Sequence, residues 1–349
     1  LYLWNMKTGE TEKHYRFAVP IVSLQKAENG DLWIGTFNGG LYCLDSSGMS
    51  RYTSEKDGLL SNSIWALEEK DGWLWIGYLD SGLQYGKLKE KKLETYKDVS
   101  GLVASLCISN DVLVVGMSES TVLIDLQTLK KHDVRSEDSL SRYDVNQAYC
   151  DSRGLIWMAA RGGLRVYDMK RHSVKAFPEI TETQGEIMAG ITEDQNHDMW
   201  VSSTRRMIHL KVSEGKDGAY VFEPHIYNDK DGLQNCDFNL RAIKTLDNGM
   251  IVAGGLYGLN VFNPQHIRYN RVLPKVMFSN LYLFNKEIEA GKEYDGRLVL
   301  SENLNLGRKI ELDYKQNILT LVLASDNFNL PEKTCYKYRM EGLSNEWLT

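Results

Sequence analysis

A short apolar motif recurs along roughly the first 250 residues and restricts the possible folds more than any other feature. It reads Leu32-Trp33-Ile34-Gly35 and then Leu74-Trp75-Ile76-Gly77. Related segments have their second residue at 114, 157, 200 and 251, so successive copies lie 39 to 51 residues apart. A period of this length predicts an array of repeats, each of which buries its apolar face against its neighbours.

Each repeat has the same internal plan, which the second copy shows clearly. An alternating segment over 64–68 and a polar turn, Lys70-Asp71-Gly72, precede the motif. A second turn leads to Gly82-Leu83-Gln84, and a fourth segment covers 92–97. Gly and Asn in such turns tolerate positive φ and join antiparallel strands. Four antiparallel strands per repeat predict an all-β fold, a β-propeller with blades centred near 33, 75, 114, 157, 200 and 251.

The motif tryptophans and glycines have a structural interpretation. Trp33, Trp75, Trp157 and Trp200, four of the eight tryptophans, hold the same blade position. Their rings offer large apolar surfaces for packing between sheets, and the glycine after them permits close backbone approach. We therefore interpret these residues as scaffold and not as a platform for stacking sugars. The third repeat has Val114 in place of tryptophan, and we expect an irregular blade there.

The two ends of the chain differ from the repeats. Residues 1–5 and 14–16 look like the third and fourth strands of an earlier blade. We therefore expect a seven-bladed propeller over 1–268, with one blade split or incomplete, in a fragment of a longer protein. The motif stops after about residue 264, and apolar segments over 276–284, 308–314, 318–324 and 335–340 predict a second domain over 269–349, a small Ig-like β-sandwich. A short linker is expected over 266–274.

Composition and charge exclude several classes of protein. The net charge of −6 argues against non-specific binding to nucleic acid or to an anionic membrane surface. No apolar run approaches the ~18 residues of a membrane span, and residues 1–10 lack the pattern of a signal peptide. The five cysteines, Cys43, Cys107, Cys150, Cys236 and Cys335, contain no C-x-x-C pair. We expect them to be buried apolar residues, with neither a disulfide framework nor a zinc site.

Motifs of catalysis are absent from the sequence. It contains no Gly-x-Ser-x-Gly, His-Glu-x-x-His or P-loop, and its seven histidines are scattered. The segment from Asp151 to Trp157 faintly resembles the Asp box of sialidase-like propellers, but most repeats lack the aspartate. The sequence therefore predicts no catalytic residue, no metal ligand and no cofactor.

The irregular loops are the expected place for a ligand. Loops from the second to the third strand of each blade share a face with those that join successive blades, over 55–63, 136–146 and 229–239, and rim the central channel. Eight candidate ligand-binding residues lie on the former loops: Phe37, Asn38, Tyr78, Asp80, Arg161, Arg205, Arg206 and Tyr257. Aromatic rings suit the apolar faces of sugars, whereas amides and guanidinium groups suit hydroxyls or carboxylates.

Two alternatives stand beside this interpretation of the rim. The three arginines point to an acidic sugar, but these side chains could equally be solvated turn residues or contacts to another domain. Asn62, Asn146 and Asn235 are expected to satisfy turn backbone with their amides.

Several segments together resemble a known family. Asp57-Gly58-Leu59, followed by the Leu-Trp-Ile-Gly motif, is similar to the two-component regulator propeller repeat, and 231–264 looks like the last such repeat. Residues 336–347 resemble the triple-tyrosine (Y_Y_Y) domain that follows it, here cut short. The resemblance covers essentially the whole chain.

This resemblance implies the periplasmic sensor region of an inner-membrane hybrid two-component histidine kinase and response regulator, as in Bacteroidetes. It implies an oligosaccharide ligand from polysaccharide breakdown, read in this propeller or in one upstream, and regulation of carbohydrate-utilisation genes. It also implies a homodimer through the C-terminal domain, membrane attachment only through segments missing here, and no nucleic acid bound by this fragment. The alternatives are a protein-binding scaffold propeller and a propeller glycosidase or lyase.

Overall fold

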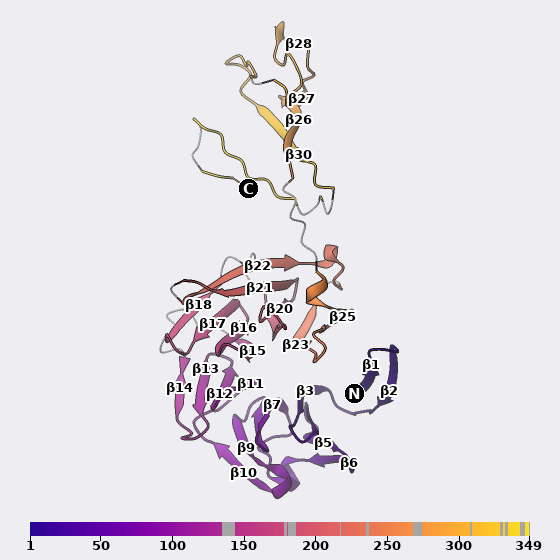
Figure 1. The fold of residues 1–349 in the computed structure, drawn as a ribbon, viewed down its shortest axis with the longest axis vertical. Coiled ribbons are helices and arrows are strands. Elements are labelled where there is room, and N and C mark those ends of the chain that lie inside the picture. The colour runs from indigo at the N-terminus through magenta and orange to yellow at the C-terminus, as the bar shows by residue number, and fades with distance from the viewer. Residues whose placement is uncertain are drawn as a thin grey trace. The chain divides into compact units, whose positions relative to one another are not determined.

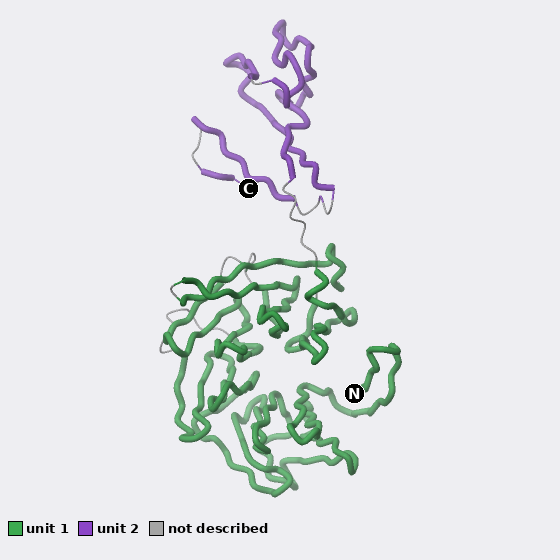
Figure 2. Tube along the Cα trace, viewed as in Figure 1, with its two compact units in different colours: residues 1–267 green, residues 268–349 purple. Residues whose placement is uncertain are grey.

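The structure is a computed structural model that divides into two compact units, residues 1–267 and residues 268–349 (Figure 2). It describes residues 1–134, 144–177, 180, 186–216, 218–234, 237–267, 274–307, 309–328, 331, 334–342 and 346–348. Part of the predicted loop 136–146, part of the linker, Asn235, Cys236 and Arg308 lie outside this set. Among the described residues, no helix is both long and apolar enough to cross a membrane.

The first unit consists of antiparallel sheets that follow one another along the chain (Figure 1). Blade one is β3 (Ile21–Lys26), β4 (Leu32–Thr36), β5 (Leu41–Asp45) and β6 (Gly48–Tyr52). Blade two is β7 (Ile64–Lys70), β8 (Trp73–Tyr78), β9 (Leu83–Lys87) and β10 (Lys92–Tyr96). Blade three is β11 (Val103–Ser109), β12 (Val112–Met117), β13 (Thr121–Asp125) and β14 (Lys131–Asp133).

Three further sheets continue the series. Blade four is β15 (Val145–Cys150), β16 (Leu155–Ala160), β17 (Gly163–Asp168) and β18 (Ser173–Ala176). Blade five is β19 (Met188–Glu193), β20 (Met199–Ser203), β21 (Met207–Glu214) and β22 (Tyr220–Tyr227). Blade six is β23 (Phe238–Thr245), β24 (Ile251–Gly255) and β25 (Gly258–Phe262). Short helical turns lie outside the sheets: α1 (Ser54–Asp57), η1 (Leu88–Glu90), η4 (Asp229–Asp231) and η5 (Pro264–His266).

The order of the sheets is that of a propeller. The first strands β3, β7, β11, β15, β19 and β23 pack against one another in sequence. The core clusters lie between neighbouring sheets, so that Trp33 and Leu41 of blade one share a cluster with Ile64 and Ile76 of blade two. The predicted all-β propeller is therefore confirmed. Blade three is complete, contrary to the expected irregularity, because Val114 fills its core position without exposure to solvent.

The two ends of the propeller differ from the full blades. β1 (Tyr2–Asn5) and β2 (Glu10–His14) pair with each other, as expected for two strands of an incomplete blade, and form a sheet of their own. In the described residues, the sixth repeat has three strands where the sequence predicts four. The two strands of this hairpin are exposed along almost their whole length, and a seventh blade beside the six sheets stays a prediction (Figure 1).

The motif residues have the structural role that the sequence predicts. The four motif tryptophans are buried. In blades one and two the motif ends in a glycine that lies against the first strand of the next blade: a Cβ on Gly35 would lie 2.8 Å from Ile64 Cγ2, and one on Gly77 would lie 2.5 Å from Val103 Cγ1. Glycine at this position therefore lets adjacent sheets approach closely.

In two blades, an aspartate in the turn before the motif accepts a hydrogen bond from the indole of the motif tryptophan. Asp151 accepts from Trp157 Nε1 and Asp194 accepts from Trp200 Nε1, each at 2.9 Å. This contact satisfies the donor of a buried ring, as buried polar groups require. The faint Asp-box pattern in the sequence therefore corresponds to a scaffold interaction.

Each first strand of the six blades contains a β-bulge near its start, at residue 22, 65, 104, 146 or 189, or within 239–242. A bulge leaves a residue outside the regular ladder. Arg241, with φ of 59°, reaches from blade six and donates through Nη1 to the carbonyl oxygens of Trp65 (2.6 Å) and Ala104 (2.7 Å). Burial lowers the pKa of Arg241 to about 10. One guanidinium group thus connects three blades.

The second unit is a smaller β structure. β26 (Val276–Leu283) pairs with β27 (Lys286–Glu287) and β30 (Leu319–Ser325), and β28 (Glu293–Tyr294) pairs with β29 (Arg297–Leu298). Its core contains Leu281, Leu283, Ile288, Val299 and Leu300.

Two of the strands predicted for this unit are not formed. The described residues of 308–314 and 335–340 hold no strand, apart from an isolated bridge between Tyr338 and Leu348. Tyr314 is 84% exposed, and Tyr338 and Met340 are exposed as well. Ile310 packs on the core of the unit without belonging to a strand, so the prediction of strands in these two segments is wrong.

Candidate ligand-binding site

The predicted rim residues lie on loops at one end of the blades, and several have exposed side chains. Phe37 and Asn38 follow β4, Asp80 follows β8, and Tyr257 lies between β24 and β25. Phe37 is 37% exposed and Tyr257 is 64% exposed. Asn38 has φ of 60°, and its Oδ1 accepts a hydrogen bond from Ser63 Oγ at 2.7 Å. Asn38 therefore stabilises its own loop, whereas the two aromatic rings face solvent.

The three rim arginines are in different environments. Arg206 is buried, and its Nε and Nη2 donate to the two carboxylate oxygens of Glu186 at 2.9 and 2.5 Å. Hydrogen bonds from Arg206 hold the pKa of Glu186 below its usual range, against the opposing effect of burial. Arg161 is exposed and lies 3.8 Å from the carboxylate of Asp144, and Arg205 is also exposed. Arg206 is therefore engaged in the core, which leaves two arginines at the surface.

Tyr78 is a core residue in the structure. Its side chain has no exposure, and its hydroxyl donates to Gln84 Oε1 at 2.5 Å and accepts from the Leu60 amide at 3.3 Å. Burial raises the pKa of the Tyr78 phenol well above its ordinary value. The ring therefore has no surface for a ligand, because the strand that ends in Tyr78 turns it inward.

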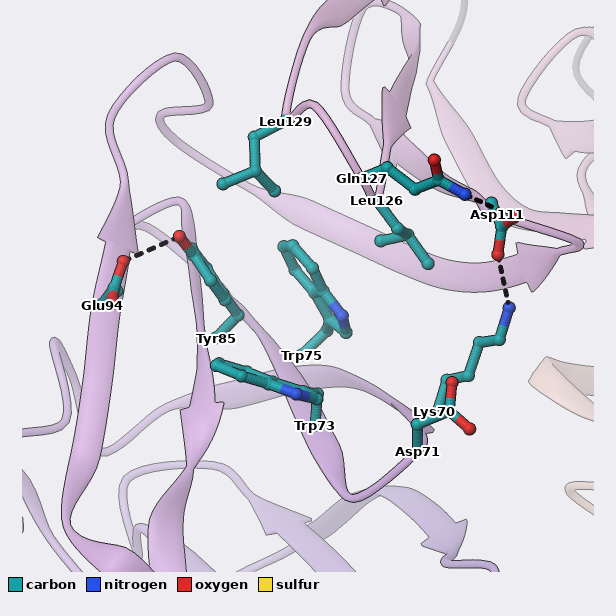
Figure 3. Close-up of a pocket in the computed structure, with 10 residues that line it drawn as sticks. All are labelled: Lys70, Asp71, Trp73, Trp75, Tyr85, Glu94, Asp111, Leu126, Gln127 and Leu129. Atoms are coloured by element: carbon teal, nitrogen blue, oxygen red, sulfur yellow. Dashed lines mark hydrogen bonds and ion pairs between the residues drawn. The ribbon is translucent and has the colours of Figure 1, made fainter.

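A cavity of about 460 Å³ lies between blades two and three (Figure 3). Ten residues line it: Lys70, Asp71, Trp73, Trp75, Tyr85, Glu94, Asp111, Leu126, Gln127 and Leu129. They come from the β7–β8 turn and strands β8, β9 and β10 of blade two, and from the β11–β12 and β13–β14 turns of blade three. These turns are at the end of the blades opposite the rim loops, since successive antiparallel strands alternate in direction. We refer to this cavity as the interblade pocket.

The aromatic wall of the interblade pocket follows from strand pairing. Trp75 on β8 is opposite Tyr85 on β9, which is opposite Glu94 on β10. The Trp75 and Tyr85 rings stack with centroids 4.5 Å apart. Trp73 lies two residues before Trp75 and so on the same face of β8, where it is 40% exposed, whereas Trp75 is buried. Figure 3 shows all three rings beside one another. Trp73 therefore offers the accessible aromatic surface.

The polar groups of the pocket are held by hydrogen bonds and an ion pair. Lys70 Nζ lies 3.1 Å from Asp111 Oδ1, and Gln127 Nε2 donates to Asp111 Oδ2 at 3.0 Å. Tyr85 donates to Glu94 Oε2 at 2.8 Å. Burial of the phenol, and to a smaller extent this hydrogen bond with the Glu94 carboxylate, raise the pKa of Tyr85 to about 12. The lining holds three carboxylates and one ammonium group. The pocket therefore has an excess of negative charge.

The sequence contains a signal for this pocket that lies outside the rim loops. Trp73 precedes the motif by two positions, so the alternation of β8 places it beside the scaffold residue Trp75. Asp111 and Gln127, in contrast, reach the same place from a different blade. Their approach depends on how the sheets pack, which no local pattern records.

Two groups of carboxylate, thiol or imidazole side chains converge elsewhere in the described residues. Asp31, Cys43 and Asp45 form one, but the Lys89 ammonium lies 2.7 Å from Asp31 and 2.9 Å from Asp45 and is an ion-pair partner of both carboxylates.

The second group is Asp194, Asp198 and His209. The His209 ring stacks on Trp200 with centroids 4.4 Å apart, and its Nε2 lies 3.2 Å from Asp198 Oδ2. Because Asp194 accepts from the same Trp200 ring, internal contacts account for both clusters.

Comparison with known proteins finds relatives that match nearly the whole chain. A curated protein named histidine kinase P4, from Formosa agariphila, is 22% identical over 379 residues, which cover 99% of this chain and 26% of that protein. No family model matches the chain. The chain thus spans about a quarter of the length of its curated relative.

Solved structures give the same picture at the level of the fold. The extracellular domain of BT3049 from B. thetaiotaomicron, named for a hybrid two-component system, has a TM-score of 0.69 at 19% identity over 97% of this chain and 46% of that chain. The extracellular domain of BT4673 from the same organism has a TM-score of 0.55 at 19% identity over 94% of this chain and 44% of that chain. The β-propeller domain of Cps50 from Myceliophteria thermophila has a TM-score of 0.55 at 12% identity over 73% of this chain and 85% of that domain.

These matches extend through both units of the chain, and the two bacterial structures are extracellular domains, one named for a hybrid two-component system and the other for a one-component system. The chain therefore has a β-propeller fold and resembles, over almost its whole length, the extracellular domains of Bacteroides two-component systems.

Proposed function

We propose that this chain is the extracellular, ligand-recognising part of a hybrid two-component sensor and that it recognises an oligosaccharide. The observation that carries the ligand class is Trp73, an exposed indole on the aromatic wall of the interblade pocket. A flat ring of this kind packs on the apolar C–H face of a sugar, while carboxylates and amides beside it accept and donate to hydroxyls. Asp71, Asp111 and Gln127 provide those groups.

The charge of the interblade pocket selects among sugars. Three carboxylates against one ammonium group repel a uronic acid or a sulfated sugar, so the expected ligand is a neutral oligosaccharide. A volume of about 460 Å³ falls in the range of small-molecule sites. The rim loops with Arg161 and Arg205 would instead favour an acidic sugar, so the two sites differ in the charge of the ligand they accept.

The output of such a sensor lies in segments other than this chain. In this proposal, the propeller and the second unit are periplasmic, a homodimer forms through the second unit, and the bound state alters transcription of carbohydrate-utilisation genes through a kinase. Ligand binding can shift a dimer equilibrium only if the ligand has different affinities for its two states. Sedimentation of the chain with and without ligand measures that difference directly.

A titration of the purified chain with neutral and acidic oligosaccharides, followed by calorimetry and tryptophan fluorescence, tests the ligand class. We expect binding of a neutral sugar that Trp73→Ala weakens by roughly tenfold or more, the equivalent of about 1.4 kcal/mol. Trp4→Ala is the matched control, because Trp4 is a similarly exposed indole on β1 and lies outside the pocket.

A double variant on the rim loops distinguishes the interblade pocket from the rim as the ligand site. Arg161→Ala combined with Arg205→Ala leaves binding unchanged if the interblade pocket holds the ligand. Loss of binding in that double variant, with Trp73→Ala unaffected, would assign the ligand to the rim. A complete absence of binding across chemically diverse glycans would overturn the proposed ligand class.

A further inference from the structure

Two cysteines on neighbouring blades lie unusually close together. Cys107 is on β11 of blade three and Cys150 is on β15 of blade four, and their Sγ atoms are 2.6 Å apart. Non-bonded heavy atoms prefer separations of about 3.5–4.0 Å, whereas the S–S bond is about 2.05 Å long. Both cysteines are free thiols in the structure, and their sulfurs are nearer to bonding distance than to contact distance. Cys43 is in blade one, and Cys335 belongs to the second unit.

The surroundings of the pair fit a cross-link. β11 and β15 are the first strands of their blades and pack against each other. Both thiols are half-buried and pack on the core cluster that contains Val114, Val145 and Ile156. No described third ligand converges on them, since the two metal-capable groups of the described residues contain neither cysteine. A structural zinc ion requires four ligands, so a pair alone favours sulfur–sulfur chemistry.

We propose that Cys107 and Cys150 form a disulfide bond that links blade three to blade four. The proposal rests on the proposed function for its setting, because extracellular chains meet an oxidising environment in which disulfides form and persist. The oxidant is an external disulfide, either that of a dithiol oxidase or oxidised glutathione. One cysteine thiolate attacks a sulfur of this disulfide and displaces a thiolate, which gives a mixed disulfide. The other cysteine thiolate then displaces the second thiolate. Two protons are released, and the external disulfide gains two electrons.

The position of the bond determines when it forms. Burial, and to a smaller extent the contact with the Cys150 sulfur, raise the pKa of the Cys107 thiol well above its ordinary value. The nucleophilic thiolate is therefore scarce once the blades have packed. We expect oxidation to be fast during folding and slow afterwards, and we expect the finished bond to resist reduction until the chain is unfolded.

Mass spectrometry of the whole chain tests the proposal. The reduced, denatured chain is refolded in a glutathione redox buffer, alkylated and digested without reductant. We expect a linked peptide pair that contains Cys107 and Cys150 and a mass two hydrogens lower than that of the reduced chain. Cys43 and Cys335 serve as internal controls and should be fully alkylated after denaturation. Quantitative alkylation of Cys107 and Cys150 in the oxidised sample would overturn the proposal.

Thermal unfolding gives a second, independent readout. The oxidised chain should melt roughly 5–10 °C above the reduced chain, because the bond closes a 43-residue separation in the unfolded ensemble. The variant with Cys107→Val and Cys150→Ala should show no dependence on the redox buffer. A dependence that persists in this variant would mean that other cysteines carry the effect. Disulfide formation without glycan binding would leave this inference intact and refute the proposed ligand. Glycan binding without a disulfide would support the proposed ligand and refute this inference.

Discussion

The approach of adjacent blades at Gly77 leads to a quantitative prediction for Gly77→Ala. A Cβ at this position would lie 2.5 Å from Val103 Cγ1, 2.9 Å from Val103 Cβ and 3.2 Å from Ala66 Cβ. Carbon atoms prefer separations of about 3.5–4.0 Å, so β8 of blade two and β11 of blade three must move apart by several tenths of an ångström or more. Overpacking of this kind costs about 1–3 kcal/mol.

The backbone of Gly77 does not itself oppose alanine, since its φ is not in the left-handed region. Alanine in a compatible conformation stabilises by about 0.4–1 kcal/mol through the unfolded chain. We therefore expect a net loss of about 1–2 kcal/mol of unfolding free energy, measured as a lower urea midpoint at unchanged slope by tryptophan fluorescence.

A double-mutant cycle identifies the cause of this loss. Val103→Ala removes the Cγ1 atom nearest the new methyl group, so the double variant should lose at least about 1 kcal/mol less than the sum of the single variants. In the motif of blade four, Ala159 occupies the position that Gly77 has in blade two, two residues after the motif tryptophan. Blade four therefore already has a methyl group at this position. Ala159→Gly should destabilise rather than stabilise. A neutral Gly77→Ala variant, or simple additivity in the cycle, would refute the proposed steric cause.

Three further predictions concern buried polar groups. Arg206→Met leaves the buried Glu186 carboxylate unpaired and should cost about 3–5 kcal/mol in urea unfolding; the addition of Glu186→Leu should recover part of it, and equal losses in the single and double variants would contradict this account. Burial raises the pKa of Glu68 from 4.5 to about 7, so the folded chain holds the proton over this window. The stabilising contribution of Glu68 is therefore fully present below pH 4.5 and is lost as the pH rises through 7. The wild type should lose stability relative to Glu68→Gln over this range, whereas a difference independent of pH would exclude Glu68 as the source. Asp194→Ala removes the acceptor of the buried Trp200 indole and should cost about 1–3 kcal/mol; a change below about 0.5 kcal/mol in the urea midpoint would show that the contact contributes little.

The propeller could be predicted from the sequence because its information is local and repeated. The motif around Trp33 and Trp75 recurs at the same blade position, and each copy specifies one strand, its buried face and a small residue that admits the next sheet. The second unit contains no repeated motif, so a strand predicted from one short apolar segment cannot be compared with an equivalent segment elsewhere. The residues around Tyr314 and Tyr338 alternate in the same way but are largely exposed, so alternation alone misled there.

The candidate site was less predictable, because it depends on contacts between segments that are distant in sequence. Arg206 has the sequence context of an exposed turn residue, yet Glu186, twenty residues earlier, draws it into the core. The alternation of β8 could have placed Trp73 beside Trp75. The approach of Asp111 from the next blade, however, depends on the packing angle between two sheets, which neither sheet encodes alone.

The contact of Arg241 has a consequence for how the propeller unfolds. An array of repeats in which each unit contacts only its neighbours can lose its terminal units one after another. Arg241 contacts Trp65 at a sequence separation of 176 residues and Ala104 at one of 137, so opening blade six also exposes carbonyl groups in blades two and three. Amide hydrogen exchange in β23 should therefore be thermodynamically linked to exchange in β7 and β11. Through this one side chain, fraying at one end of a linear array becomes a cooperative event that involves half of its blades.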